Sequence, residues 1–125
     1  MNISRNFLVI GSLYLLVGVT LGTVMGATGD HSLMGVHAHI NLVGFALMSI
    51  FGLIYRAFPA MAENMLGTIH FWGHQLSAVV FLIALYFLLS ESASEAAVGP
   101  IIGISTVVLC LATAVFVWNL FKNGN

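Results

Sequence analysis

Charged residues are scarce in this chain of 125 residues: three are basic and four are acidic, and together they make up 6% of the sequence. A soluble domain carries about 25% charged residues, whereas 60% of this chain is hydrophobic. The composition therefore excludes a soluble globular domain and a disordered chain. With three Lys and Arg residues in all, the chain lacks the basic surface that nucleic-acid binding requires, so we expect no nucleic-acid partner.

Cysteine is nearly absent as well. The single Cys110 excludes a disulfide framework and a cysteine-rich metal or iron–sulfur site. Acidic residues are missing from the apolar runs, which argues against a proton relay built from carboxylates. Because the sequence contains no nucleophilic triad, phosphate-binding loop or carboxylate pair, no residue is assigned a catalytic role.

Four uncharged runs separate the charged residues, and each is longer than the roughly 20 residues that a helix needs to cross a bilayer. These runs lack the strict alternation of a transmembrane β-barrel. The sequence therefore predicts an all-α integral membrane protein, a four-helix bundle that forms a single transmembrane domain over residues 1–125. We expect the helices at about residues 6–26, 35–58, 65–90 and 98–121.

The distribution of charge sets the expected orientation. Four spans put the N-terminus, the second loop and the C-terminus on one side of the membrane. All three basic residues lie on that side, whereas three of the acidic residues lie on the other. Because basic residues mark the cytoplasmic side, both termini are predicted to be cytoplasmic. The basic residues are Arg5, Arg56 and Lys122, and the acidic residues opposite are Asp30, Glu91 and Glu95.

Small residues follow one face of the first helix, where Gly18, Gly22 and Gly26 form two overlapping GxxxG steps. Such a stripe brings helices into close contact in membranes. It also leaves room for a flat cofactor, such as a porphyrin, beside the backbone, and both interpretations stay open. We expect a homo-oligomer that packs partly through this stripe.

The five histidines all lie between residues 31 and 74, outside the first and fourth helices. Ionisable residues inside membrane spans mark functional sites, and neutral imidazole is a common ligand of metals and of haem iron. This clustering is therefore the main functional signal in the sequence. The histidines are His31, His37, His39, His70 and His74.

His37 and His39 are two residues apart, so on a helix they point about 200° away from each other. We expect His39 to face inward as a ligand, while His37 caps the helix or faces another subunit or the outer water. Asn41 lies one helical turn after His37 and can hydrogen-bond to it, so these two are supporting residues or alternative ligands. A different hypothesis is an outer-face copper or zinc site, with ligands from His31, His37, His39 and Asp30.

His70 and His74 lie four residues apart and share one face of the third helix. They form a second candidate site, either as ligands of one metal or cofactor or as hydrogen-bonding partners of neighbouring helices. At 1.5 Å per residue, His39 and His70 lie about 15 Å apart in height. Because two axial imidazole nitrogens sit about 4 Å apart across an iron, one chain cannot use both on one haem. A second ligand beside His39 would come from Met25, Met34, the His39 of a second copy or a partner protein, or the iron would have no second protein ligand.

Two stretches carry a family resemblance. The second helix opens with His39-Ile-Asn41-Leu42 and ends through Tyr55-Arg-Ala-Phe-Pro59, and the third carries Phe71-Trp72-Gly73-His74-Gln75. They resemble the second and third helices of the catalytic subunit (subunit I) of haem–copper oxidases and nitric oxide reductases, closest to the C-family, over about residues 35–89. The whole chain resembles small four-helix proteins similar to that subunit, which carry a His-Ala-His-Ile-Asn-Leu motif and a His-Phe-Trp motif.

The resemblance implies that His39 is an axial ligand of a haem b, because the histidine opening that helix of subunit I ligates its low-spin haem. The helices that carry the other haem and copper ligands of subunit I have no counterpart here, which argues against a complete terminal oxidase. The resemblance implies an oxidoreductase-related electron-transfer or sensing module in the bacterial cytoplasmic membrane, with respiratory-chain redox partners. The alternatives are a copper or zinc protein, and an accessory subunit of a respiratory complex.

Overall fold

A computed structural model describes all residues 1–125 and confirms the all-α prediction, since the chain contains helices and no strands. Four stretches are long and apolar enough to cross a membrane, as expected of a multi-pass four-helix membrane protein in contact with lipid. Their limits differ from the predicted ones by at most three residues. The spans are α1 (Ile3–Thr28), Met34–Ala57, α5 (Met65–Leu89) and α6 (Glu95–Asn123), and the short helix α4 (Pro59–Ala62) lies in the second loop.

The second span is not one regular helix, a feature that the sequence did not predict. It consists of α2 (Met34–His39), the π-helical turn η1 (Ile40–Ala46) and α3 (Leu47–Ala57). In η1 the backbone N–H of Leu47 donates to the carbonyl of Leu42, one residue further back than in an α-helix. In an α-helix the N–H of Leu47 would donate to the carbonyl of Val43, so this carbonyl loses its α-helical donor.

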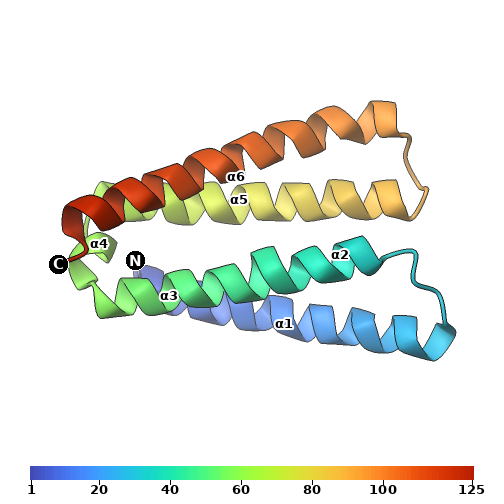
Figure 1. Ribbon diagram of the computed structural model, residues 1–125, viewed down its shortest axis with the longest axis horizontal. Coiled ribbons are helices and arrows are strands. Elements are labelled where there is room, and N and C mark those ends of the chain that lie inside the picture. Colours follow the sequence, from blue (N-terminus) through green and yellow to red (C-terminus); the bar gives the residue numbers. More distant parts are fainter.

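The spans form two hairpins that lie side by side (Figure 1). One hairpin joins α1 to the second span, and the other joins α5 to α6, which pack along each other. Both termini lie at the same end of the bundle as α4, as four spans require (Figure 1). The bundle is narrow at this end and widens toward the opposite end. That the narrow end is cytoplasmic stays a prediction from the charges.

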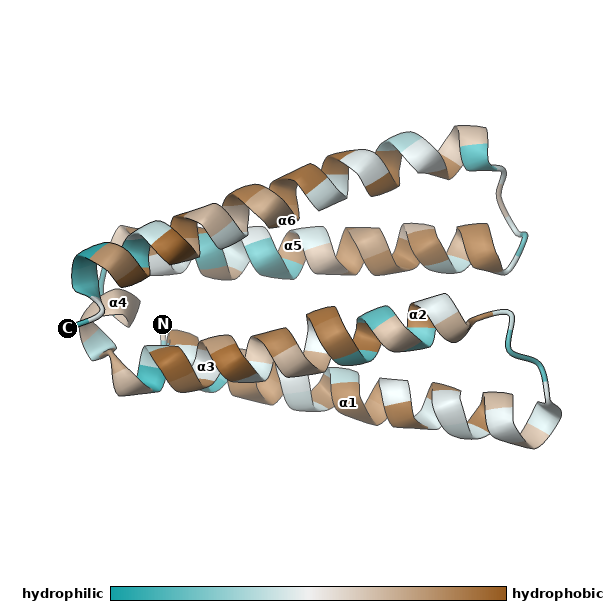
Figure 2. Cartoon of the chain, in the orientation of Figure 1, coloured by the Kyte–Doolittle hydropathy of each residue, from teal (hydrophilic) through white to brown (hydrophobic).

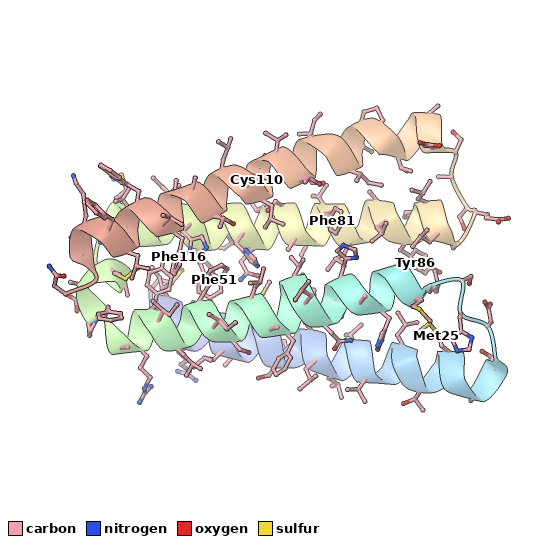
Figure 3. The ribbon with its side chains drawn as sticks, in the orientation of Figure 1. Met25, Phe51, Phe81, Tyr86, Cys110 and Phe116 are labelled. Atoms are coloured by element: carbon pink, nitrogen blue, oxygen red, sulfur yellow. The ribbon has the colours of Figure 1, made fainter.

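The buried core lies in the narrow half of the bundle and is rich in aromatic rings. Phe7, Phe51, Tyr55, Phe71 and Phe116 belong to one cluster contributed by all four spans. Phe51 and Phe116 meet between the two hairpins, with ring centroids 4.7 Å apart (Figure 3). Most of the helical residues are apolar, and hydrophilic residues concentrate in the loops, at the two ends of α6 and along parts of α2 and α5 (Figure 2).

The glycine stripe of α1 is used inside the chain. A Cβ on Gly22 would lie 2.7 Å from Cε1 of His37, and a Cβ on Gly18 would collide with the side chain of Asn41. Close helix contact is therefore the correct interpretation for these two glycines. Gly26 meets nothing within 4 Å. Packing of a homo-oligomer through Gly18 and Gly22 was a wrong expectation, because α2 and η1 of the same chain already cover them.

Candidate functional site

His37 lies in the contact between the first two spans. Its Nδ1 is 2.9 Å from the carbonyl oxygen of Gly18, so the ring donates its proton across to α1. The Asn41 side chain donates to the His37 carbonyl over 3.0 Å and lies 3.4 Å from both ring nitrogens. The predicted pairing of His37 and Asn41 is confirmed. The His37 side chain is partly exposed and packs against α1, where Gly18 and Gly22 leave space for it.

His39 projects from a different face of α2, toward α5. Its Nδ1 is 2.7 Å from the carbonyl oxygen of Gly35, one turn earlier in the same helix. Its ring packs edge-on against Phe81, with centroids 5.2 Å apart, and the side chain is partly exposed. A carbonyl only accepts, so the proton lies on Nδ1 and the Nε2 lone pair is left without a partner in the chain. A histidine held in this way can ligate a metal through Nε2.

The two histidine levels are separate, as predicted. Phe81, which contacts His39, is eleven residues along α5 from His70. That separation corresponds to about 16 Å along the helix axis. His39 and His70 of one chain therefore cannot bind the same haem.

His70 lies in the aromatic core and is fully buried. Its Nδ1 is 2.9 Å from the hydroxyl of Tyr55 on α3, and its ring lies 4.5 Å from that of Phe51 and 5.0 Å from that of Phe116. This contact joins α5 to α3, as expected if the histidine bonds to a neighbouring helix. Its Nε2, however, is buried without a hydrogen-bond partner.

His74 is also fully buried, one turn further along α5. Its Nε2 lies 3.2 Å from the carbonyl oxygen of Val43, the carbonyl that the π-helical turn bypasses. His74 therefore bonds to the second span through a backbone group that the irregular turn makes available. Its Nδ1 is buried without a partner.

The outer loop does not assemble a metal site in this structure, because no three His, Cys, Asp or Glu side chains come together anywhere in the chain. His31 is exposed and its Nδ1 lies 2.9 Å from the carbonyl of Gly29. The Ser32 backbone N–H donates to the Asp30 carboxylate over 2.9 Å and holds its pKa below the usual range. Asp30 thus caps a loop turn, and His37 is engaged with α1.

The methionines considered as second ligands lie on other faces. Met34 is exposed and lies five residues before His39, about 140° away around the helix. Met25 is buried on α1, the helix that packs on the His37 face of α2. Neither methionine therefore lies beside His39 as a second ligand.

An apolar groove of about 980 Å³ runs between α1, α2 and α5 in the wide half of the bundle. Val36 and Ile40, which flank His39 in sequence, line one wall, and Tyr86 and Phe87 of α5 line another. No histidine lines the groove. The His39 ring therefore lies outside this groove and beside Phe81, which is labelled in Figure 3.

Two residues that organise the narrow end were missed by the sequence analysis. Asn119 is fully buried in the last turns of α6, donates to the carbonyl of Met61, and accepts from Asn64. Its signal was present, because an amide inside an apolar run is expected to bond between helices. The pairing of Tyr55 with His70 had no signal, because it depends on how the second and third spans align.

Comparison with models of known families, with curated proteins and with solved structures finds no match to this chain. The resemblance to subunit I of haem–copper oxidases therefore stays a prediction from the sequence.

Proposed function

We propose that this protein binds haem b in the membrane through His39 and serves as an electron-transfer or sensing module. The observation that carries the proposal is the hydrogen bond from His39 Nδ1 to the Gly35 carbonyl. It fixes the tautomer that presents an Nε2 lone pair, the form that ligates haem iron. When bound, haem supplies one-electron redox chemistry; the chain supplies the ligand and its orientation.

The surroundings of His39 fit an apolar, flat ligand that is shared between chains. Phe81 stands edge-on to the imidazole and offers an aromatic wall for a porphyrin. The chain supplies no second ligand at this height, and the side chain is partly exposed. We propose that a second copy supplies its own His39, which gives a bis-histidine haem in a two-fold homo-oligomer. Respiratory-chain proteins of a bacterial cytoplasmic membrane are the proposed redox partners.

The test is an absorption spectrum of the protein purified in detergent after expression with added haem precursor. The wild-type protein should show a Soret band, and His39→Ala should lose it while the protein still inserts. His31→Ala is the matched control, since this exposed histidine lies in the loop before the same span and should keep the band. A wild-type spectrum in His39→Ala, or haem carried by a monomer in native mass spectrometry, would contradict the proposal.

A further inference from the structure

Two histidines of α5 each have one buried ring nitrogen without a hydrogen-bond partner. His70 Nε2 and His74 Nδ1 are both buried and have no hydrogen-bond partner, and both side chains are 0% exposed. Buried polar atoms in folded proteins nearly always have a partner. The two residues are one turn apart, so their side chains share a face of α5. Two unsatisfied nitrogens on one buried face point to a ligand that both nitrogens bind.

The hydrogen bonds on the opposite side of each ring define what these nitrogens offer. The Val43 carbonyl only accepts, so His74 carries its proton on Nε2 and leaves a lone pair on Nδ1. The Tyr55 hydroxyl can accept from Nδ1–H of His70, which leaves the Nε2 lone pair free. Tyr55 also lines a pocket of about 430 Å³ at the narrow end, toward which its own proton can point. Histidines that bind metals are held in this manner, with the non-ligating nitrogen donating to an oxygen.

The separation of the rings fits one ion between them. The centroids of His70 and His74 are 6.0 Å apart. Metal–nitrogen bonds of about 2 Å, with about 1.2 Å from each nitrogen to its ring centre, give about 6.4 Å for a collinear arrangement. The observed distance is close to this value, so the spacing of the two rings accommodates a slightly bent arrangement of two imidazoles around one ion.

The surroundings select the charge of the ion. The rings packed against the pair belong to Phe7, Phe51 and Phe116, and no carboxylate joins the histidines. Burying a charge in such a medium is costly, and the cost rises with the square of the charge, so a divalent ion without an anionic ligand is disfavoured. The faces of aromatic rings stabilise a single positive charge.

We propose that His70 and His74 form a buried two-coordinate site for monovalent copper, separate from the haem proposed at His39. Imidazole nitrogens suit copper, and Cu(I) accepts two nitrogen ligands in a near-linear arrangement. The pocket at the narrow end reaches Tyr55, which contacts His70 directly. This pocket is the entry side for the ion.

The test is an anaerobic titration of the full chain in detergent with Cu(I), in competition with a chromophoric Cu(I) chelator. The wild-type protein should bind one ion per chain. His70→Gln and His74→Gln should each lower the affinity at least a hundredfold, whereas His31→Ala and His39→Ala should leave it unchanged. Because His39→Ala is also the haem test, loss of the haem band with retained copper binding separates the two proposals. A wild-type chain that binds no stoichiometric Cu(I), or one whose binding depends on His31 or His39, overturns the copper site.

X-ray absorption of the copper-loaded wild-type protein keeps the proposal testable even if the glutamine variants fold poorly. The spectrum should show two nitrogen ligands and no sulfur, and a sulfur ligand would overturn the assignment. Tyr55→Phe removes the oxygen that holds His70 and should weaken copper binding about 10–100-fold, with the same two-nitrogen spectrum. A merely structural role for Tyr55 would leave the copper affinity unmoved, which would also count against the site.

Discussion

His37 and His39 differ in chemistry because of their neighbours and not because of their residue type. Nδ1 of His37 donates to α1 and its Nε2 lies near the Asn41 amide, so the ring links the first two spans. In His39, Nδ1 donates to a carbonyl of its own helix and Nε2 has no partner in the chain. The role of each histidine therefore depends on which acceptor its Nδ1 meets, a carbonyl across the contact in one case and a carbonyl one turn back in the other.

The glycine stripe offers a matched pair of substitutions. Gly22→Leu should destabilise the protein by about 1–3 kcal/mol, the usual cost of forcing a large side chain into a packed contact. The physical reason is the 2.7 Å approach of a Cβ at this position to His37. Gly26→Leu is the control, because nothing lies within 4 Å of its Cβ position. Thermal unfolding in detergent, monitored by circular dichroism, measures the stability of both variants. Equal stabilities would contradict the close contact between Gly22 and His37.

The π-helical turn in the second span determines which backbone and side-chain groups this span presents to its neighbours. Because η1 separates α2 from α3, the carbonyl of Val43 is available to His74, and His37 can face α1 while α3 packs in the core. Single π-helical turns in helices often occur at functional sites. Here the turn connects both histidine levels: it begins directly after His39 and ends on the helix that supplies Tyr55 to His70.

The end of α6 is joined to α4 and α5 by amide hydrogen bonds. Asn119→Ala would leave the Met61 carbonyl and the Asn64 side chain without their buried partner, at a cost of about 1–3 kcal/mol. Asn123→Ala is the control, because Asn123 only donates to Asn119 from the partly exposed end of the helix. Thermal unfolding in detergent should show a clear loss for Asn119→Ala and little for Asn123→Ala; the reverse order would refute this role of Asn119.

As a whole, the molecule has its long-range polar contacts between spans, while most residues of its helices are apolar (Figure 2). Large apolar side chains such as Leu16 and Phe121 are strongly exposed, as expected of helices that contact lipid. The helices gain no hydrophobic driving force from each other in lipid, so packing and hydrogen bonds hold the hairpins together.

The topology predicts opposite locations for two reporter positions. Fusions after Asn125 should report the cytoplasm, and insertions in the loop Ser92–Ala97 should report the other side, since the basic residues gather with the termini. The measurement uses two reporters, one that is active only in the cytoplasm and one that is active only on the other side of the membrane. Finding both positions on one side would overturn the four-span topology, and a consistent reversal would overturn the orientation alone.

Much of the architecture follows from composition, because a chain that crosses a bilayer must satisfy its backbone groups internally, and apolar runs without alternation can do so only as helices. The uncharged runs predict the four spans, and their number places both termini at one end. The pairing of His37 with Asn41 also follows from helical spacing. The π-helical turn does not, because residues 40–46 contain no proline, and a single glycine such as Gly44 is also frequent in regular membrane helices.

The faces taken by the histidines were decided by tertiary structure. Helical spacing separates His37 from His39 by about 200°, but which one meets α1 depends on the space left by Gly18 and Gly22 in the folded chain. In the same way, spacing puts His70 and His74 on one face, while their partners Tyr55 and Val43 come from another span. The sequence determines which segments are apolar and which residues share a face of a helix, because these properties are local. The alignment of one span against another determines which nitrogens are used and which stay free, because it depends on contacts between residues far apart in the chain.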